Sequence, residues 1–494
     1  MKYLYGASVK KIQSYIFESS KLQEIAGASE LVEYVCTTLF DKLLGFRNAK
    51  VQKIIQAAGN IRAVIEDRET AEEIMLKFPK SATEAAPGIQ LVQGIVELKN
   101  EKLTAADSQD LEDILKKQTP VLSPYKDWSV TRKAPRSGRA LYQLEDGEAY
   151  DIASWKKREV VNLHWRNLEK KFGVEKPFQC NMEKLAGKDN FVAVIHADGN
   201  SLGKTLMKLK DSPDYGEKWC EFSQELDKAT TCAAKRSYDE VFNQAQDKFR
   251  AIILGGDDLT VVCAAEYAID FTKKYLEYFK DECKKRHDVL GPLTACAGIA
   301  FIKTNFPFYY GVELAEMLCA ASKKEAKAHS ENPVPSSFLF AKELGSFVDE
   351  SFAAFTARNL TIQTEQDDVL SLVYGPYKTA RDEHGGEMLP FIDDLQDAAD
   401  CLQYSPLHSA IRKMITELHI STDSAKLLAD RAEAIAEEKG ERAKKAISEL
   451  KEKLCALSGK QEHSLYKLLC SGKKSPMLDL LTAQQFTVAE KGKE

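Results

Sequence analysis

Apolar residues follow the same succession of strand-like and helix-like spacings in two stretches of the chain. In the first stretch, short alternating segments flank longer segments in which apolar residues recur three and four positions apart. The predicted elements are strand 2–9, helix 10–44, hairpin 51–67, helix 68–85 and strand 88–99. The hairpin is expected to turn at Gly59-Asn60, where Asn suits a position with positive φ. The order of this stretch is therefore β-α-β-β-α-β.

The second stretch repeats this order with additional helices. Its predicted elements are strand 190–198, helices 201–209 and 216–245, hairpin 250–263, helix 265–286, strand 293–303, helix 310–330 and strand 336–341. The repeat lies in the order of the elements and not in residue identity. Because the order β-α-β-β-α-β defines the ferredoxin-like fold, we expect two domains of that fold in an α+β protein.

The two remaining regions differ from these stretches. The region 106–185 is expected to be a basic linker with a helix at 154–172. Its basic cluster is formed by Arg132, Lys133, Arg136 and Arg139. Such a cluster suits either a solvated face or a surface that meets phosphates. Apolar residues at helical spacing over 389–457 predict an all-α C-terminal region. The expected domains are 1–105, 106–185, 186–345 and 346–494.

Composition narrows the class of protein. The 494 residues carry a net charge of -6, which argues against a protein coated in nucleic acid but leaves room for local basic patches. No apolar run approaches the ~20 residues of a transmembrane helix, and the N-terminus lacks the apolar core of a signal peptide. The 11 cysteines include no C-x-x-C pair, which indicates reduced thiols, a cytoplasmic protein and no zinc knuckle.

Two adjacent acidic residues stand at the predicted hairpin tip of the second stretch. In "RAIILGGDDLTVVC", Asp257 and Asp258 follow Gly255 and Gly256 between two apolar strands. Glycines let a backbone approach a ligand closely, and neighbouring carboxylates repel each other unless a cation offsets the repulsion. A hard divalent cation such as Mg²⁺ suits these oxygen ligands, and a solvated turn is the alternative explanation.

A third acidic residue is expected beside this tip. Asp198 ends the predicted strand 190–198, and Gly199 allows a tight exit into a helix that starts near Ser201. In a ferredoxin-like sheet the first strand lies beside the hairpin, so Asp198 and Asp257 are expected at the same rim although they are 59 residues apart. Taken alone, Asp198 would suit a helix N-cap or a strand-end turn equally well.

Two lysines on a following helix add a candidate phosphate site. Lys323 and Lys327 are one helical turn apart and share a face. The pair would suit a triphosphate if that face looks toward the acidic rim, and a solvated charged face is the alternative. Lys204, in the helix after Asp198, is a weaker candidate of the same kind.

Together these motifs resemble a known family. The segments "FVAVIHADGNSLGKTL", "RAIILGGDDLTVVC" and "AEMLCAASKKEAK" are similar to the second palm domain of the large polymerase-cyclase subunit of type III CRISPR effector complexes. The segment "VKKIQSYIFESSKLQEIAGASELVEYV" resembles the first, catalytically degenerate palm of that subunit, and "LQYSPLHSAIRKMITELH" resembles its helical last domain. The resemblance implies two ferredoxin-like palm domains packed together and an all-α C-terminal domain.

The resemblance also implies an enzyme, a nucleotidyltransferase that condenses ATP into cyclic oligoadenylates in antiviral defence. Two Mg²⁺ or Mn²⁺ ions would be held by Asp198 and Asp257, with Asp258 assisting. The other implied site residues give the backbone room, hold the triphosphate or contact the nucleotides: Gly199, Asn200, Ser201, Gly255, Gly256, Lys323, Lys327 and, in the degenerate palm, Ser29. Implied partners are ATP, RNA or CRISPR effector subunits as activators, and further chains in a homo- or hetero-oligomer, without a membrane.

The sequence departs from the family pattern at two points. Asn200 stands where the family often has a second Asp, so one metal ion would bind less tightly or have fewer ligands. The family also often carries an HD nuclease domain and a cysteine-bound zinc, whereas the one His-Asp pair here, His287-Asp288, lies at a predicted helix end. DNA cleavage is therefore not expected, and a compact stand-alone relative is an alternative to a subunit of a complex.

Two other functions are compatible with these residues. One is a non-catalytic scaffold whose palms bind nucleotides or RNA without turnover, with the basic segment from Arg132 to Arg139 as the RNA contact. The other is a diguanylate cyclase, which shares the palm core and uses GTP. Those enzymes usually carry a Gly-Gly-(Asp/Glu)-Glu-Phe turn, and Leu259 stands here in place of the Phe.

Overall fold

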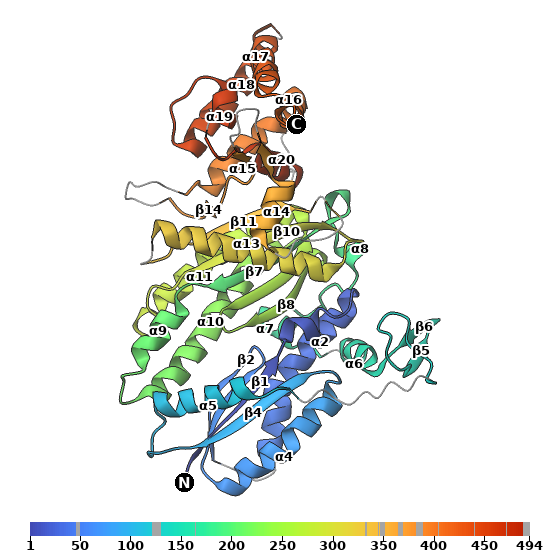
Figure 1. Cartoon of the computed structure of the whole chain (residues 1–494), viewed down its shortest axis with the longest axis vertical. Coiled ribbons are helices and arrows are strands. Elements are labelled where there is room, and N and C mark those ends of the chain that lie inside the picture. The colour runs from blue at the N-terminus through green and yellow to red at the C-terminus, as the bar shows by residue number, and fades with distance from the viewer. Residues whose placement is uncertain are drawn as a thin grey trace.

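The chain is an α+β protein in which two sheets are followed by a helical region. The computed structural model describes all residues except 46–49, 121–129, 164, 331–332, 344, 346–350, 364–368, 382–388, 404, 439, 471 and 488–494. Figure 1 shows the first sheet at the end that carries the N-terminus, the second sheet in the middle and the helical region at the other end. No helix in the described part of the chain is long and apolar enough to cross a membrane.

The first sheet is antiparallel and has the ferredoxin-like order β2-β3-β1-β4. Its strands are β1 (Tyr3–Lys10), β2 (Val51–Ala57), β3 (Asn60–Ile65) and β4 (Gln90–Glu97). The helices packed on it are α2 (Leu22–Tyr34), α3 (Phe40–Gly45), α4 (Arg68–Ala85) and α5 (Ala105–Lys117). This confirms the β-α-β-β-α-β order that the apolar pattern predicts for the first stretch.

Both faces of the first sheet are covered because neighbouring strand residues point to opposite sides. Tyr5 stacks on Phe40, which in turn packs edge-on against Phe78 of α4. The adjacent Leu4 belongs to a second cluster with Leu111 of α5 on the other face. Helix α5 therefore completes the first domain, although the sequence assigned residues from 106 onward to a linker.

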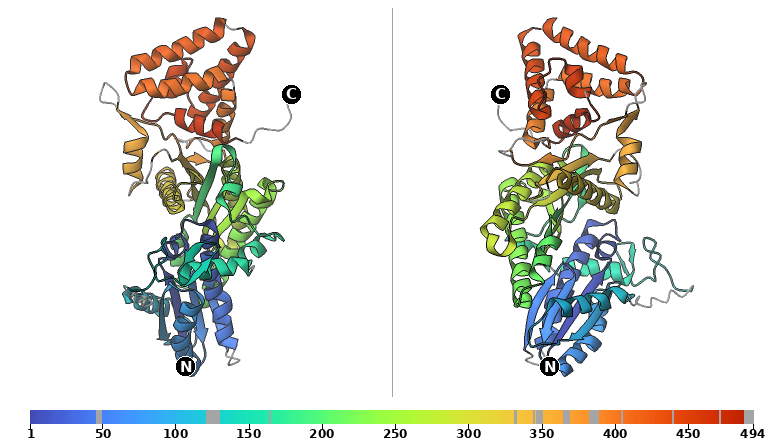
Figure 2. Two further views of the ribbon diagram at one scale, coloured as in Figure 1. Left: turned by 90° about the vertical axis from the view of Figure 1, so that its right-hand side faces the viewer. Right: turned by 60° about the vertical axis from the view of Figure 1, so that its left-hand side comes forward.

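The second sheet contains six strands in the order β14-β11-β10-β7-β9-β8. The strands are β7 (Phe191–Gly199), β8 (Phe249–Gly255), β9 (Asp258–Ala264), β10 (Ala295–Lys303), β11 (Ser337–Lys342) and β14 (Tyr377–Lys378). The four strands β8-β9-β7-β10 repeat the order of the first sheet, which confirms the second ferredoxin-like unit. Helices α10 (Tyr215–Val241) and α11 (Ala268–Lys285) cover one face, and α13 (Phe308–His329) covers the other (Figure 2).

The hairpins of the two domains match residue by residue. In the first, Ala57 pairs with Asn60, and in the second, Gly255 pairs with Asp258. Each first strand also carries a bulge three residues before its end, between Lys53 and Ile55 in β2 and between Ala251 and Ile253 in β8. A shared bulge at a shared position supports a common origin of the two domains, because bulges are specific features of a strand pair.

The turn of the first hairpin lies one position earlier than predicted. Ala58 and Gly59 form it, with φ values of 48° and 74°, and Asn60 is already the first residue of β3. The prediction that Asn60 occupies the left-handed position is therefore wrong. A two-residue turn with positive φ at both central positions matches the twist of the strands, and Gly59 meets this need without strain.

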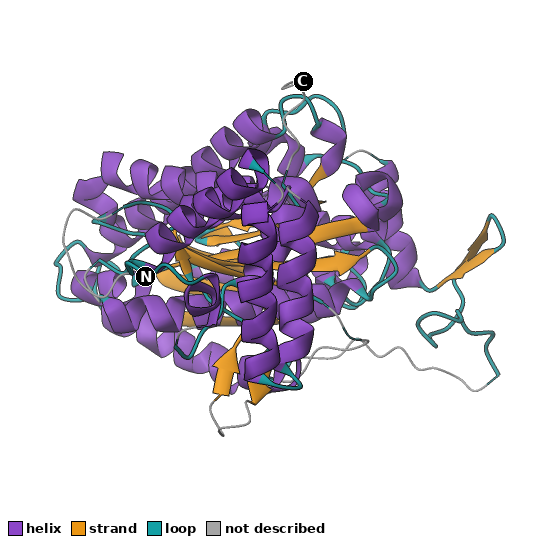
Figure 3. Ribbon diagram, turned by 90° about the horizontal axis from the view of Figure 1, so that it is seen from above, coloured by secondary structure: helices purple, strands orange, loops and turns teal. Residues whose placement is uncertain are grey.

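The region 106–185 wraps around the first domain. After α5 it forms the hairpin β5 (Gln143–Glu145) and β6 (Glu148–Tyr150), which projects from the body in Figure 3, and then α6 (Ile152–Asn162), α7 (Asn167–Phe172) and α8 (Met182–Leu185). The predicted helix 154–172 is thus two helices. Helix α6 lies directly on α2, and the side chain of Lys157 is buried there, with Nζ 2.8 Å from the carbonyl oxygen of Tyr15.

The C-terminal region is mostly helical but also contains short strands. The helices are α14 (Phe352–Asn359), α15 (Ile392–Asp400), α16 (Ser405–Leu418), α17 (Thr422–Glu438), α18 (Glu441–Ser458), α19 (Leu465–Cys470) and α20 (Met477–Gln485). Strands β12 (Thr361–Gln363) and β13 (Val369–Ser371) pair with each other, and β14 joins the second sheet beside β11. The helical expectation for this region misses these strands, which are too short to produce a pattern of their own.

Gly27 of α2 is the position where the packing of α6 leaves least room. A Cβ at this position would lie 1.6 Å from the carbonyl oxygen of Lys157, which is a backbone atom and cannot turn aside. We expect Gly27→Ala to lower the free energy of unfolding by about 3 kcal/mol or more, as severe overpacking does. Urea unfolding followed by circular dichroism measures this change.

Gly45→Ala is the matched control, because a Cβ there meets nothing within 4 Å. This helical substitution should be neutral or stabilising by roughly 0.5–1 kcal/mol. Equal stability of the two variants would contradict the close packing of α2 on α6.

Candidate active site

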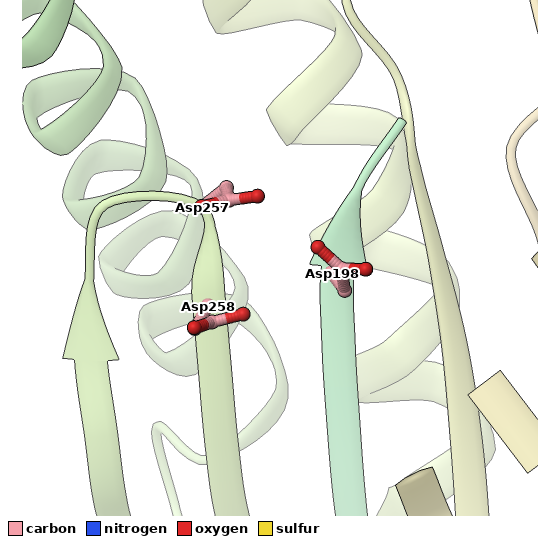
Figure 4. Close-up of side chains that lie close together, drawn as sticks. All are labelled: Asp198, Asp257 and Asp258. Carbon is pink, nitrogen blue, oxygen red and sulfur yellow. The ribbon is translucent and has the colours of Figure 1, made fainter. Parts of the chain in front are cut away.

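Three carboxylates gather where β7 and the hairpin β8–β9 end. Figure 4 shows Asp257 at the hairpin turn, Asp258 at the start of β9 and Asp198 near the end of the neighbouring β7. Each offers a carboxylate oxygen, and these oxygens lie within 4.8 Å of one another. The structure thus brings together the three acids that the sequence suggested as metal ligands.

Strand register and glycine account for this meeting. Strand β7 pairs with β9 so that Ala197 lies opposite Leu259, and continuing this register puts Asp198 beside Asp258. A Cβ on Gly199 would lie 3.0 Å from the Cβ of Asp257 and 2.4 Å from a methyl carbon of Leu202. Gly199 therefore leaves the room that Asp257 occupies.

The turn itself depends on Gly256. Its φ is 63°, a left-handed value at the first central position of the two-residue turn, which glycine adopts readily. Gly255 lies against the other hairpin tip, since a Cβ there would be 3.4 Å from the backbone nitrogen of Ala58. The tips of the β2–β3 and β8–β9 hairpins therefore meet at the acidic site.

Burial and mutual repulsion raise the pKa values of two of the carboxyl groups. The pKa of Asp257 rises to about 7, first because burial disfavours the charged form and then because Asp258 and Asp198 are close. The pKa of Asp258 rises to about 6 through burial, then through Asp198 and Glu316, against the opposing charge of Lys323. The cluster thus holds more negative charge than its surroundings neutralise.

These features fit a hard divalent cation. The cluster offers carboxylate oxygens, the ligands that Mg²⁺ and Mn²⁺ prefer, and a cation between them would offset the repulsion that raises both pKa values. Asp198, Asp257 and Asp258 are the residues that could hold it. An all-oxygen cluster suits these ions better than Zn²⁺, which favours nitrogen and sulfur ligands.

Of the two predicted phosphate-binding lysines, one reaches the acids. The Nζ of Lys323, on α13, lies 2.5 Å from Oδ2 of Asp198 and 2.6 Å from the carbonyl oxygen of Gly199. Lys327, one turn further along the same helix, is exposed. Lys204 lies on α9 (Leu202–Leu209), where its side chain is exposed.

A cavity of about 480 Å³ opens beside the acids, between the two domains. The first domain lines it with residues of β1, α1 (Ile12–Ile16) and α2 and with Ala58, and the second domain with His196, Gly255 and Asp258, among others. Its volume lies within the range of small-molecule sites. A ligand in this cavity would contact both domains and one of the three acids.

Ser29 lies in this cavity wall, where the sequence suggested a contact to a second nucleotide. Its side chain is 7% exposed, and its hydroxyl donates a hydrogen bond to the carbonyl oxygen of Ile252, the bulged residue of β8. Lys171 of α7 likewise donates to the carbonyl oxygen of Leu254, at 3.0 Å. Both contacts satisfy carbonyl groups on the outer edge of β8, so Ser29 also fastens the first domain to the second.

Comparison with known proteins relates the second domain to a family. The family model described as Cas10/Cmr2, second palm domain, matches residues 191–331. This segment is similar to a Cas10-type second palm domain. The match confirms the resemblance drawn from the sequence motifs, and it covers both strand ends that carry the acids.

One solved structure agrees with this chain at the level of the fold. The crystal structure of Csm1 from T. onnurineus has a TM-score of 0.52 and 13% identity, over 99% of this chain and 70% of that chain. Csm1–Csm4 cassettes in complex with pppApA and with cA4 have TM-scores of 0.49 and 0.42 and identities of 10% and 14%; they cover 99% and 66% of this chain.

The chain is shorter than the proteins it matches. It covers 69% of the matched chain in the cassette with pppApA and 53% of the matched chain in the cassette with cA4. The chain thus spans about half the length of the first structures it matches. No curated protein sequence matches the chain.

In the first palm, neutral side chains replace the acids. The hairpin match puts Gly59 in the place of Asp257 and Asn60 in the place of Asp258, and the strand register puts Ser8 in the place of Asp198. The hydroxyl of Ser8 donates to Oδ1 of Asn60 at 2.8 Å. These positions offer no carboxylate, in agreement with the expectation of a degenerate palm.

A cationic side chain lies directly beneath this neutral pair. Arg62 is 4% exposed, and its guanidinium donates to Ser8 Oγ at 3.3 Å and to the carbonyl oxygen of Ala7 at 2.9 Å. It also forms an ion pair of 2.5 Å with Glu112 of α5. The first palm thus carries an arginine, paired with Glu112, beneath the positions that correspond to Asp198 and Asp258 of the second palm.

Asn200 and Ser201 lie at the exit of β7. The amide of Asn200 is 1% exposed and donates to Thr294 Oγ1 at 3.0 Å and to Cys296 Sγ at 3.3 Å, which ties this exit to β10. Ser201 has a left-handed φ of 64° and precedes α9 without a side-chain cap. The amide nitrogen of Asn200 is thus used in packing, whereas its buried Oδ1 has no hydrogen-bond partner within the described part of the chain.

The basic segment of the linker is largely engaged within the chain. Arg136 forms an ion pair of 2.7 Å with the buried Glu24, and Arg139 forms one with Glu18. Arg132 is exposed. Two of the four basic residues proposed as a phosphate-binding surface thus hold this segment against α1 and α2, which weakens the scaffold alternative.

His196 and Glu316 belong to the site although sequence reasoning did not select them. His196 shares a 3.0 Å hydrogen bond with Thr260, and burial lowers its pKa to about 4, so the ring is neutral at pH 7. Its position two residues before Asp198 on a strand could have revealed it, since such residues share a face. Glu316 stands seven residues before Lys323 on α13, the spacing of one helix face.

The raised pKa values predict how the metal-free protein responds to pH. Between about pH 4 and pH 7 the unfolded chain loses the Asp257 proton before the folded protein does, so this group lowers stability as pH rises. Asp257→Asn removes that effect. In chelator at pH 8 it should raise the free energy of unfolding by on the order of 1 kcal/mol, and near pH 4 by much less.

Urea unfolding at both pH values tests this, with the exposed Asp281→Asn on α11 as the control. Adding Mg²⁺ or Mn²⁺ at pH 8 should stabilise the natural protein and have little effect on the Asp257→Asn variant. An unchanged or lower stability of Asp257→Asn at pH 8 would contradict the crowding of charge at this site.

Proposed function

We propose that the chain is a metal-dependent nucleotidyltransferase that joins ATP molecules into linear and cyclic oligoadenylates. The observation that carries this proposal is the cluster of Asp198, Asp257 and Asp258, of which Asp258 lines a cavity shared by the two palms. A nucleotide in this cavity would contact both domains. A Cas10-type second palm is the domain in which the family resemblance expects this activity.

The residues have distinct parts in this proposal. Asp198, Asp257 and Asp258 hold the cation, which when bound lowers the pKa of a ribose hydroxyl and stabilises the pyrophosphate leaving group. Lys323 binds the triphosphate, and its contact with Asp198 keeps it beside the acids until a nucleotide arrives. Gly255 and Gly256 let the hairpin backbone approach the nucleotide. The first palm binds the second nucleotide along the wall that contains Ser29.

Little acid–base chemistry is asked of the protein, because positioning and charge dominate phosphoryl transfer. The ribose oxygen of one nucleotide attacks the α-phosphorus of the other, and the bond to the β-phosphate oxygen breaks to release pyrophosphate. The neutral ring of His196 lines the cavity and adds no charge beside the reacting groups. The proposed partners are those of the resemblance: RNA and CRISPR effector subunits, in a hetero-oligomer.

Asp257→Ala combined with Asp258→Ala tests the catalytic assignment. Removing both hairpin ligands should lower pyrophosphate release from ATP with Mg²⁺ or Mn²⁺ by at least about 10²–10³-fold, the loss typical for key electrostatic groups. Pyrophosphate assays with and without RNA, and mass spectrometry of the products, measure this. Circular dichroism shows whether the variant is folded.

The same assay separates the alternatives. A folded double variant with unchanged products would remove the acids from the mechanism. Products from GTP alone would favour the diguanylate-cyclase alternative. RNA binding without nucleotide consumption, lost when Arg132, Arg136 and Arg139 are neutralised and weakened by salt, would favour the scaffold.

The two predicted lysines should differ in importance. Lys323 contacts Asp198 and Lys327 is exposed one turn away, so Lys323→Ala should lower kcat/KM for ATP by roughly 10–100-fold and Lys327→Ala by only a few-fold. Steady-state kinetics at saturating Mg²⁺ measures both. A larger loss of kcat/KM in Lys327→Ala than in Lys323→Ala would contradict the assignment of Lys323 as the residue that binds the triphosphate.

A further inference from the structure

A second cavity adjoins the one beside the acids. It has a volume of about 340 Å³ and lies between α1 of the first palm and α13 of the second. Gln13 and Ser14 line both cavities, so the two are neighbours with a common wall. The aromatic rings of Phe17 and Tyr309 line the second cavity, and the Phe17 ring also packs on Phe308 at 5.9 Å.

One hydrogen bond crosses the boundary between the cavities. The amide Nε2 of Gln13 donates to Oε1 of Glu316 at 2.5 Å, from the first palm to the second. Gln13 sits in a helix of five residues that begins directly after Lys11, whose φ is 51°. Glu316 lies on the same face of α13 as Lys323, two turns earlier. The Gln13–Glu316 hydrogen bond therefore lies between Lys323, the proposed phosphate-binding residue of α13, and the second cavity.

The charged residues in the walls of the two cavities differ. Lys11, Glu33 and Asp258 line the first cavity, so a cation stands among its acids, whereas the charged residues that line the second cavity are the carboxylates of Glu18, Glu313 and Glu316. Of these, Glu18 is neutralised by Lys157 at 3.0 Å. Carboxylates repel phosphate groups but accept hydrogen bonds from amino and hydroxyl groups, and the exposed ring of Tyr309 offers a stacking face for a base. The lining therefore suits a base with its ribose and not a triphosphate.

We propose that the second cavity receives a nucleoside unit of an oligonucleotide that has grown beyond the two reacting nucleotides, and that the Gln13–Glu316 hydrogen bond limits product length by closing it. The inference rests on the proposed function. While the bond holds, a third nucleoside has to displace it, so short products leave. When the bond is absent, the cavities of about 480 Å³ and 340 Å³ are continuous and longer products are retained.

Variants at the two ends of this bond test the proposal. Gln13→Ala and Glu316→Ala remove it, while Glu316→Gln keeps an acceptor for the Gln13 amide and removes only the charge. Loss of one ordinary hydrogen bond changes an equilibrium constant about two- to tenfold. Both Ala variants should therefore increase the ratio of products with three or more nucleotides to dinucleotides by that factor. Glu316→Gln should stay near the natural ratio.

Gln23→Ala on α2 and Glu325→Gln on α13 are the controls, because both side chains have polar partners outside the two cavities, Asn162 and Lys474. Mass spectrometry gives product lengths, and pyrophosphate release gives total turnover. A binding measurement without turnover complements them. In Gln13→Ala, the affinity for a linear triadenylate with a 5′-triphosphate should rise about two- to tenfold relative to the affinity for a non-hydrolysable ATP analogue.

The outcomes separate this proposal from the one on which it rests. If the natural protein releases no pyrophosphate from any nucleotide, the proposed function fails, and the triadenylate affinities alone decide whether the second cavity takes a nucleoside. If pyrophosphate is released but product length and triadenylate affinity are the same in Gln13→Ala, Glu316→Ala and the controls, the role of the hydrogen bond is overturned. The same holds if Glu316→Gln behaves like Glu316→Ala.

Discussion

Repulsion among three carboxylates is the constraint around which the second palm is arranged. Asp198, Asp257 and Asp258 are half-buried and close enough that two of them take up protons near neutral pH when no cation is present. A protein keeps such an arrangement at a cost in stability, as active sites commonly do. Apolar strands on either side of the tip, a glycine at each approach and the contact from Lys323 hold the acids in place.

The contact between the palms depends on the outer edge of β8. An unpaired strand edge would leave carbonyl groups without donors, and here Ser29 and Lys171 supply donors to the carbonyl oxygens of Ile252 and Leu254. The first palm and α7 thus cover the edge of the second sheet. The cavity beside the acids lies within this contact, next to the hairpin tips where Ala58 and Gly255 meet. The cavity is therefore a product of the packing between the two domains.

Sequence reasoning located the acids because element order determines strand neighbours in this fold. The order β-α-β-β-α-β puts the first strand beside the hairpin, which was enough to place Asp198 next to Asp257 and Asp258. The failures have physical reasons as well. The partners of Arg136 and Arg139 are acidic residues more than a hundred positions away, and a local pattern cannot reveal them. The hydrogen bond from Gln13 to Glu316 spans 303 positions and was equally hidden.

Arg62 gives the two palms different dependence on their surroundings. Its guanidinium is covalently part of the chain and is paired with Glu112, so the charge beneath Ser8 and Asn60 is balanced within the chain and cannot be diluted, chelated or exchanged. In the second palm, Lys323 contacts one of the three acids, and a divalent ion in solution would offset the rest of their repulsion. The first palm therefore reaches its charge balance as soon as the chain has folded, whereas that of the second palm would vary with the ions around it.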